Sequence, residues 1–378
     1  MGLPLHFEPG PGLSLALALA AGMVAQSVAR HLRLPGIVLL LAVGVVLGPD
    51  GLELVLPADL GATVPLLVGF AVAIILFEGA MNLDFARLVH ERRSIRNLVT
   101  LGALVTWAGG ALAARWWLGW DWTLCVLFGS LVIVTGPTVI QPLLRRIRVR
   151  SSVATVLEAE GVLIDAVGAV VAVVALEIVL HPAGGGLATG ALGLLGRLLV
   201  GALIGAAGGA AIALLLRFRR LVPEGFENVF TLSLVLALFQ IANALLEESG
   251  IVAVTAAGLL VGNVKAPTLA DLKEFKEQLT VLLIGALFVV LAADVRVREV
   301  AELGWRGLAV VLVLMLVVRP LGIAACTLGS ELGARERLFL SWMAPRGIVA
   351  AAVASLFAQQ LEDRGLEGAA SFAPWSSS

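Results

Sequence analysis

The chain alternates long apolar stretches with short loops that carry most of its charged residues. A helix that crosses a bilayer needs about 20 predominantly apolar residues. By this criterion we predict twelve membrane-spanning segments, at 12–30, 36–52, 60–80, 96–117, 122–143, 152–180, 188–216, 227–246, 250–263, 277–293, 305–328 and 336–358. The loops between them are too short for a soluble domain. The pattern therefore predicts an all-α polytopic membrane protein with a single transmembrane domain over 1–378.

Composition supports this class. Hydrophobic residues make up 60% of the 378 residues and charged residues only 14%, whereas soluble domains average about 25% charged residues. The 42 glycines suit close helix packing in lipid. A net charge of −1 without a basic patch argues against a nucleic-acid partner, so the bilayer is the expected surrounding.

The basic residues predict the orientation. Most of the 26 Lys and Arg residues fall in alternate loops between the predicted segments. Cytoplasmic loops are the ones enriched in Lys and Arg. This distribution places the N-terminus outside a cytoplasmic membrane, and twelve spans return the C-terminus to the same side.

Segment 152–180 is apolar enough for the bilayer but contains three acids in its first half, Glu158, Glu160 and Asp165, and a fourth, Glu177, near its outer end. Asp165 lies about 20 Å along the helix axis from the cytoplasmic end, near the middle of the bilayer. Ionisable groups at this depth are expensive and usually functional. Glu158 lies closer to the cytoplasmic end, where water can solvate it.

Two arginines inside predicted segments are candidate counter-charges, Arg319 and Arg346. Arg319 lies too deep in its segment to reach the interface, so it requires a buried carboxylate. We predict that Glu160 is this partner. Asp165 then has no permanent cation, and its carboxylate can hold a proton or a small cation in turn. Such competition is what an exchanger requires.

Two predicted segments contain helix-breaking sequences. Segment 122–143 contains VIVTGPTVIQP and segment 336–358 contains MAPRGIV. Gly and Pro at mid-membrane free backbone groups that can line a polar cavity. These fifth and twelfth segments run in opposite directions, which is typical of transporters built from inverted repeats with crossed, discontinuous helices. We expect helices one to six at 12–180, a linker helix at 188–216, and helices eight to twelve at 227–358.

Five motifs carry a family resemblance: ILFEGAMNLD (75–84), TGPTVIQPLLR (135–145), EGVLIDAVGAV (160–170), VVRPLGI (317–323) and APRGIVAAAVASLF (344–357). Together they resemble bacterial monovalent cation/proton antiporters of the NhaP type, over nearly the whole chain. The resemblance implies Na⁺ or K⁺ exchange against protons by alternating access, without an enzymatic reaction or a cofactor. It also implies a homodimer in the bacterial cytoplasmic membrane.

The resemblance assigns roles to the motif residues. Asp165 corresponds to the aspartate that binds the transported ion, and Thr135 to a threonine that contributes to this site at the unwound part of helix five. Glu160 corresponds to the glutamate that pairs with an arginine of helix eleven, here Arg319.

Two further motif residues, Glu78 and Arg346, complete the implied set, and Glu158 lies just before the motif 160–170. Glu78, together with Glu158, is expected near the cytoplasmic funnel, and Arg346 compensates charge in the broken twelfth helix.

The chain departs from the family pattern at three positions near the expected ion site. Ile164 stands where many members have Asn, Gly161 where a Ser is common, and Gly136 where an Asp follows the threonine. A bound ion would rely more on backbone carbonyls and water, which leaves the choice between Na⁺ and K⁺ open. The lack of a second aspartate beside Asp165 favours electroneutral exchange.

The stretch 359–378 lacks a further apolar run, so the thirteenth helix and the regulatory domain of the family are expected to be absent. A truncated, non-transporting member is therefore an alternative, as is a potassium-efflux type of transporter. A membrane-embedded hydrolase is disfavoured because the chain has no HExxH motif. The four histidines, His6, His31, His90 and His181, fall in or near loops, so no metal-ligand cluster is expected.

Overall fold

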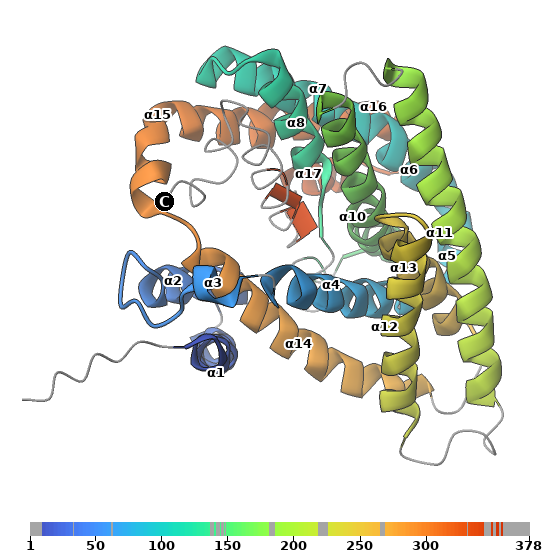
Figure 1. The fold of residues 1–378 in the computed structure, drawn as a ribbon. Coiled ribbons are helices and arrows are strands. Elements are labelled where there is room, and N and C mark those ends of the chain that lie inside the picture. The colour runs from blue at the N-terminus through green and yellow to red at the C-terminus, as the bar shows by residue number, and fades with distance from the viewer. Residues whose placement is uncertain are drawn as a thin grey trace, which may run out of the picture. The chain divides into compact units, whose positions relative to one another are not determined.

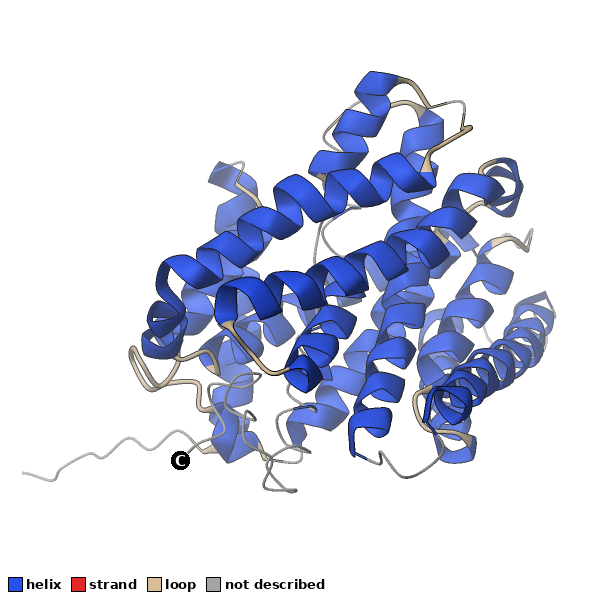
Figure 2. Cartoon of the chain, turned by 90° about the horizontal axis from the view of Figure 1, so that it is seen from above, coloured by secondary structure: helices blue, strands red, loops and turns tan. Residues whose placement is uncertain are grey.

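The computed structural model describes helices and their connecting loops (Figure 2). The described residues are 10–32, 34–61, 63–136, 140, 144, 147, 149–180, 186–217, 226–264, 269–330, 332–343, 349–350, 353–354 and 357. Within them, seven helices are long and apolar enough to cross a membrane, and four shorter apolar helices accompany them. The predicted all-α polytopic class is confirmed.

The helices follow the predicted segments closely (Figure 1). The first half of the chain contains α1 (Pro11–Leu32), α2 (Gly36–Leu47), α3 (Pro57–Leu60), α4 (Thr63–Met81), α5 (Phe85–His90), α6 (Arg92–Asn97), α7 (Ala103–Ala113), α8 (Trp122–Ile133) and α10 (Ser151–Leu180). The second half contains α11 (Gly186–Arg217), α12 (Glu227–Leu245), α13 (Ser249–Gly262), α14 (Leu269–Ala293), α15 (Val297–Val313), α16 (Arg319–Cys326) and α17 (Ala334–Trp342).

Three π-helical segments interrupt this series. They are η1 (Leu98–Gly102), η2 (Ala114–Leu118) and η3 (Leu314–Val318). The first two flank α7, and the third joins α15 to α16, so the fourth and eleventh predicted segments are not uniform α-helices. The π-helical turn is rare and often marks a functional site.

The expected breaks occur where Gly and Pro predict them. Helix α8 ends at Ile133, and Val134 is extended with ψ 117°. Gly136 precedes Pro137, and a residue before proline is disfavoured in the α-helical region. Helix α17 ends at Trp342 in the same manner. Most of each motif that follows, including 137–139 and 344–348, lies outside the described residues.

The eleventh predicted segment, 305–328, begins directly after a break at Gly304, whose φ is +49° and ψ −141°. A further helical stretch from Val297, which the sequence prediction does not include, precedes this break within α15. A residue with a side chain is strained at this φ, so glycine permits the bend. The amphipathic turn before Gly304 is too polar for a hydropathy criterion, and for this reason the sequence prediction missed it.

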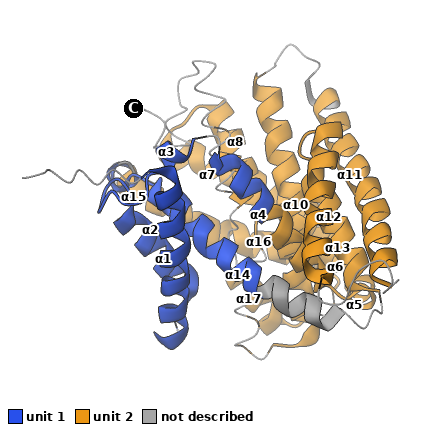
Figure 3. Ribbon diagram, turned by 60° about the horizontal axis from the view of Figure 1, so that its bottom comes forward, with its two compact units in different colours: residues 1–71, 278–302, 377–378 blue, residues 72–277, 303–376 orange. Residues whose placement is uncertain are grey.

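The chain divides into two compact units (Figure 3). Unit 1 contains 1–71 and 278–302, and its helices α1, α2 and α14 pack through small residues. A Cβ at Gly22 would lie 2.6 Å from the carbonyl carbon of Gly285, so α1 and α14 touch backbone to backbone. Such approach is the usual way in which helices associate in lipid.

Polar contacts fix the loop that follows α14 in unit 1. Asp50 accepts a hydrogen bond from the Val297 backbone N–H at 2.8 Å and lies 3.4 Å from Arg296. Asp294 lies beside them, and burial raises the pKa of its carboxyl to about 6, although Arg296 acts in the opposite direction.

Unit 2 contains 72–277 and 303–376 and is built around α10. This helix packs against α8, α11, α13, α5, α6, η1 and α17. Accordingly, 67% of the apolar stretch of α10 is buried inside the protein, whereas only 28% of the apolar stretch of α11 is buried. Glu160 and Asp165 of α10, each 2% exposed, are therefore enclosed by protein rather than by acyl chains.

Helices α11 and α13 approach each other most closely at Gly205. A Cβ at this position would lie 2.2 Å from the Ala253 carbonyl oxygen and 2.8 Å from its Cα. Gly196 lies on the same helix, but a Cβ there would meet only the Leu246 Cδ2 atom, at 3.9 Å.

We expect Gly205→Ala to lower the thermal stability of the purified protein, because the added methyl group forces the two backbones apart, at about 1–3 kcal/mol. Gly196→Ala is the matched control and should be neutral or stabilising, since alanine favours the helix by about 1 kcal/mol. The melting temperature in detergent measures both. Equal melting temperatures for the two variants would contradict the close approach.

Asp294→Asn should raise the melting temperature at pH 8 but not at pH 4. The folded protein holds the proton of this carboxyl more tightly than the unfolded chain, so ionisation costs stability as the pH rises from about 3.8 to about 6. Melting curves of wild type and variant across this range test the sign. A gain that is the same at both pH values would contradict it.

Candidate ion-exchange site

Asp165 is deeply buried on α10, with 2% of its surface exposed. Among the residues that the structure describes, its Oδ1 atom has no hydrogen-bond partner. Gly168 lies one turn further along the same face of α10. A Cβ at Gly168 would approach the Val134 Cα at 3.3 Å, so this face meets the broken end of α8.

Thr135 lies in the extended stretch that follows α8. It is 4% exposed, and its hydroxyl is buried without a hydrogen-bond partner within the described ranges. Such a buried, unsatisfied hydroxyl costs about 1–3 kcal/mol unless water or a ligand completes it. The helix break therefore places an available hydroxyl beside the face of α10 that carries Asp165.

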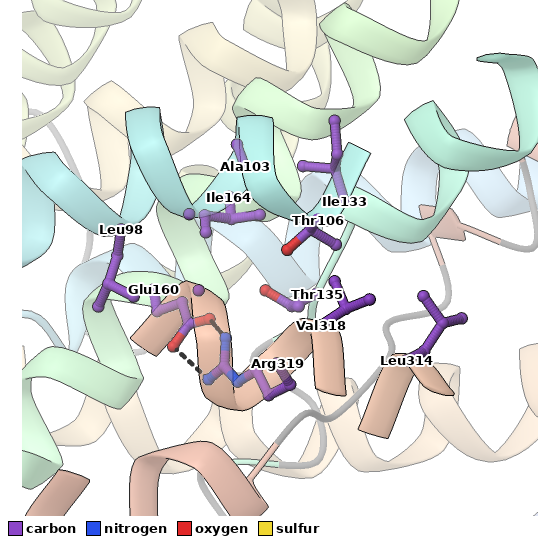
Figure 4. A pocket seen from close by; sticks show the side chains of 12 residues that line it. Leu98, Ala103, Thr106, Ile133, Thr135, Glu160, Ile164, Leu314, Val318 and Arg319 are labelled. Carbon is purple, nitrogen blue, oxygen red and sulfur yellow. Dashed lines mark hydrogen bonds and ion pairs between the residues drawn. The ribbon is translucent and has the colours of Figure 1, made fainter. Parts of the chain in front are cut away.

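The predicted pair between Glu160 and Arg319 is confirmed (Figure 4). Arg319 is the first residue of α16 and donates from Nη1 to Glu160 Oε1 and from Nη2 to Oε2, the latter at 2.9 Å. Its Nε lies 3.3 Å from the Leu340 carbonyl oxygen of α17. Both side chains are almost fully buried, and such a bidentate pair is geometrically specific.

Three of the predicted site residues border one small cavity. About 20 Å³ of space is bordered by Thr135, Glu160 and Arg319, and its described lining is completed by Leu98, Gly102, Ala103, Thr106, Ile133, Ile164, Leu314, Val318 and Gly322. This volume suits one water molecule. Residues of both η1 and η3 line it. Asp165 does not border this cavity, but its neighbour Ile164 does.

The remaining predicted residues lie elsewhere. Glu78 on α4 is 5% exposed, and Glu158 on α10 is half-buried. A separate hollow of about 600 Å³ opens at the start of α10, and its described lining includes Arg150, Ser152 and Thr155 but neither of these two acids. Arg346 lies outside the described residues.

Coordination of a cation would use few side chains. No group of three His, Cys, Asp or Glu residues gathers in the described part of the chain. Asp165 supplies the carboxylate and Thr135 the hydroxyl closest to the break, and carbonyls freed by the break are the natural complement.

The sequence prediction missed a second ion pair, in which the arginine is buried and the Glu177 side chain is 43% exposed. Arg197 on α11 is 6% exposed and binds both carboxylate oxygens of Glu177 on α10. Its Nε also donates to the Glu247 carbonyl oxygen at 3.0 Å. Next to it, in the loop between α12 and α13, burial raises the pKa of Glu248, an effect that Arg197 opposes. Arg197 within an apolar segment was the available signal, because it cannot reach water from there.

We expect Arg319→Met to lower the free energy of unfolding by about 3–5 kcal/mol, because it leaves Glu160 as a buried charge without its partner. The double variant Glu160→Leu, Arg319→Met removes both charges and should recover most of this loss. Melting temperatures in detergent compare the three proteins. A single variant as stable as the wild type would show that the pair is not needed for the fold.

Comparison with known proteins identifies a family and several relatives of this chain. Residues 15–372 match the family described as sodium/hydrogen exchanger, transmembrane. The chain is 28% identical over 363 residues to Na(+)/H(+) antiporter 1 of Methanocaldococcus jannaschii, covering 90% of this chain and 81% of that relative. It is 27% identical over 337 residues to the K(+)/H(+) antiporter NhaP2 of Shewanella oneidensis, covering 88% of this chain and 58% of that relative.

The fold is also similar to a solved structure, that of the sodium proton antiporter MjNhaP1 from Methanocaldococcus jannaschii at pH 8. The TM-score is 0.80 at 23% identity, with 93% of this chain and 88% of that chain covered. The structural likeness concerns the fold, and the family match covers nearly the whole sequence. The chain therefore belongs to the sodium/hydrogen exchanger family of transmembrane transporters.

Proposed function

We propose that this protein exchanges a monovalent cation for a proton across the membrane by alternating access. The observation that carries the proposal is the contrast between two buried acids on α10. Glu160 has a permanent basic partner in Arg319, whereas the Oδ1 of Asp165 has no hydrogen-bond partner among the described residues. The names of the relatives, Na(+)/H(+) and K(+)/H(+) antiporters, support the same function.

Asp165 is the group that binds proton and cation in turn. An empty, ionised carboxylate in the membrane interior carries a large desolvation cost, whereas a protonated or cation-bound one does not. The loaded forms can therefore pass between the two access states, and the empty charged form is held back. Coupled exchange follows from this difference without any further gate.

Thr135 and the backbone around the break complete the cation ligands in this proposal. Glu160 is bound by Arg319 and fixes α10 against α16, so Asp165 is the single exchanging carboxylate in this proposal. One cation then crosses for each proton, and the exchange is electroneutral. The membrane potential, about 2.3 kcal/mol per charge per 100 mV, does not drive such a cycle.

Sodium and potassium both remain candidates for the cation. Relatives of similar identity carry names with either ion. The apolar Ile164, which borders the cavity, and Gly136 after Thr135 offer no side-chain oxygen to set a size preference. Proton flux in proteoliposomes titrated with NaCl and with KCl decides between a sodium-selective and a potassium-selective exchanger.

The assembly, the membrane location and the roles of the remaining predicted residues are taken from the family resemblance in this proposal. The protein works as a homodimer in a bacterial cytoplasmic membrane with its N-terminus outside, without a resident cofactor and without an enzymatic reaction. Glu78 and Glu158 attract cations on the cytoplasmic side, and Arg346 compensates charge at the second break. The pulldown of a differently tagged second copy from the same cells tests the dimer.

Asp165→Asn should abolish cation-dependent proton flux in proteoliposomes, because the amide cannot carry an exchangeable proton or a negative charge. The flux of the wild type should be unchanged when a K⁺ gradient and valinomycin impose a membrane potential, provided that sodium is the test cation. Glu302→Gln, at an exposed position of α15, is the matched control and should transport normally.

Exchange that persists in Asp165→Asn would reject the assignment of the carrier group. A flux that follows the imposed potential would reject the one-for-one stoichiometry but not the exchange itself.

A further inference from the structure

The small cavity beside Glu160 contains a second hydroxyl that belongs to none of the motifs above. Thr106 on α7 borders this space together with Thr135, Glu160 and Arg319. Figure 4 shows the oxygens of Thr106 and Thr135 turned to the same side, where the Glu160 carboxylate lies. Two hydroxyl groups and one carboxylate thus face a single space of about 20 Å³.

The hydroxyl of Thr106 is available for a ligand. Four other threonines, Thr100, Thr231, Thr255 and Thr327, donate to the carbonyl four residues earlier, whereas Thr280 of α14 has no partner among the described residues. Within the described part of the chain, the half-buried Thr106 makes no such bond, and the Thr135 hydroxyl is buried without a partner. The Thr135 hydroxyl requires a further group to satisfy it, and the Thr106 hydroxyl borders the same cavity and can share that group.

The packing of α7 keeps Thr106 at the cavity. A Cβ at Gly109 would lie 2.6 Å from a Val318 methyl carbon, and one at Gly110 would lie 3.1 Å from the Gly129 Cα. The indole of Trp107 donates to the Val126 carbonyl oxygen at 2.9 Å. Helix α7 is therefore packed closely against both α8 and η3, which holds the backbone of Thr106 beside the cavity.

Volume and charge decide what fills the space. A buried water requires about 10–15 Å³ and two to four polar partners, and this cavity offers both. A cation here would lie next to the Arg319 guanidinium, whose charge repels it, whereas a neutral water experiences no such penalty. An empty cavity would leave the buried Thr135 hydroxyl unsatisfied.

We propose that the cavity holds one fixed water, bound by the hydroxyls of Thr106 and Thr135 and by the Glu160 carboxylate, and that Thr106 is a positioning residue for ion exchange. Through this water, Thr106 orients the Thr135 hydroxyl at the broken end of α8, beside Asp165. The inference rests on the exchange function proposed above. According to this inference, α7 contributes to cation affinity through the orientation of the Thr135 hydroxyl, in addition to the carboxylate of Asp165.

Thr106→Val tests the role, because valine has the shape of threonine without the hydroxyl. We expect the KM for the cation in proteoliposome flux to rise about five- to tenfold, which corresponds to the loss of one hydrogen bond. The maximal rate and the melting temperature should stay within about twofold and a few degrees of wild type. Thr106→Ser keeps the hydroxyl and should restore the wild-type KM.

Two further variants separate a shared water from a structural effect. Thr100→Val, on the preceding π-helical turn, removes an exposed hydroxyl that bonds to Arg96 and should leave the KM unchanged. Thr106→Val and Thr135→Val should raise the KM non-additively when combined, because each removes a ligand of the same water.

An unchanged KM in Thr106→Val, a failure of Thr106→Ser to restore it, or additive effects with Thr135→Val would each overturn the proposal. Where Thr106→Val does not accumulate, Thr106→Ala removes the same hydroxyl. Where flux is too low to give a KM, the midpoint of cation-dependent thermal stabilisation replaces it. Exchange that persists in Asp165→Asn rejects the proposed function, whereas a silent Thr106→Val beside an inactive Asp165→Asn rejects the water alone.

Discussion

An ionised side chain in the membrane interior has to be neutralised, and α10 meets this constraint in two ways within five residues. Glu160 is bound through both oxygens by Arg319. Asp165, one and a half turns further, has an Oδ1 atom without a protein partner in the described chain. The fixed pair joins α10 to α16, so the contact between these two helices does not depend on the charge of Asp165.

The irregular helices lie around this pair. Segment η1 precedes α7 and segment η3 precedes α16, and residues of both border the cavity at Glu160. They belong to the fourth and eleventh predicted segments, which are seven apart, as are the broken fifth and twelfth. Irregular backbone is tolerated at membrane depth only where protein or water satisfies it. Two of the three π-helical segments and the break after α8 therefore meet at this cavity.

Several of these features could be predicted from the sequence because they follow from the energetic cost of a buried charge or of a proline inside a helix. An arginine deep in an apolar segment needs an acid, which identifies Glu160 as the partner of Arg319. A Gly-Pro pair ends a helix, which locates the break after Ile133. Features that depend on packing could not be predicted. The π-helical turns leave no hydropathy signal, and Arg197 selects Glu177 only because α11 lies against α10.

Thr106 shows why one position of the site escapes a motif-based prediction. Its role depends on Ile164, which borders the same cavity with an apolar side chain, where the resembling family often has an asparagine. Because Ile164 offers no polar atom, hydroxyls at this space have to come from other helices, and within the described lining only α7 and the α8 break present them. Since no single segment contains both positions, this complementarity is visible only once the helices are packed. A neutral hydroxyl also avoids a further charge beside the Glu160–Arg319 pair, which an additional acid would disturb.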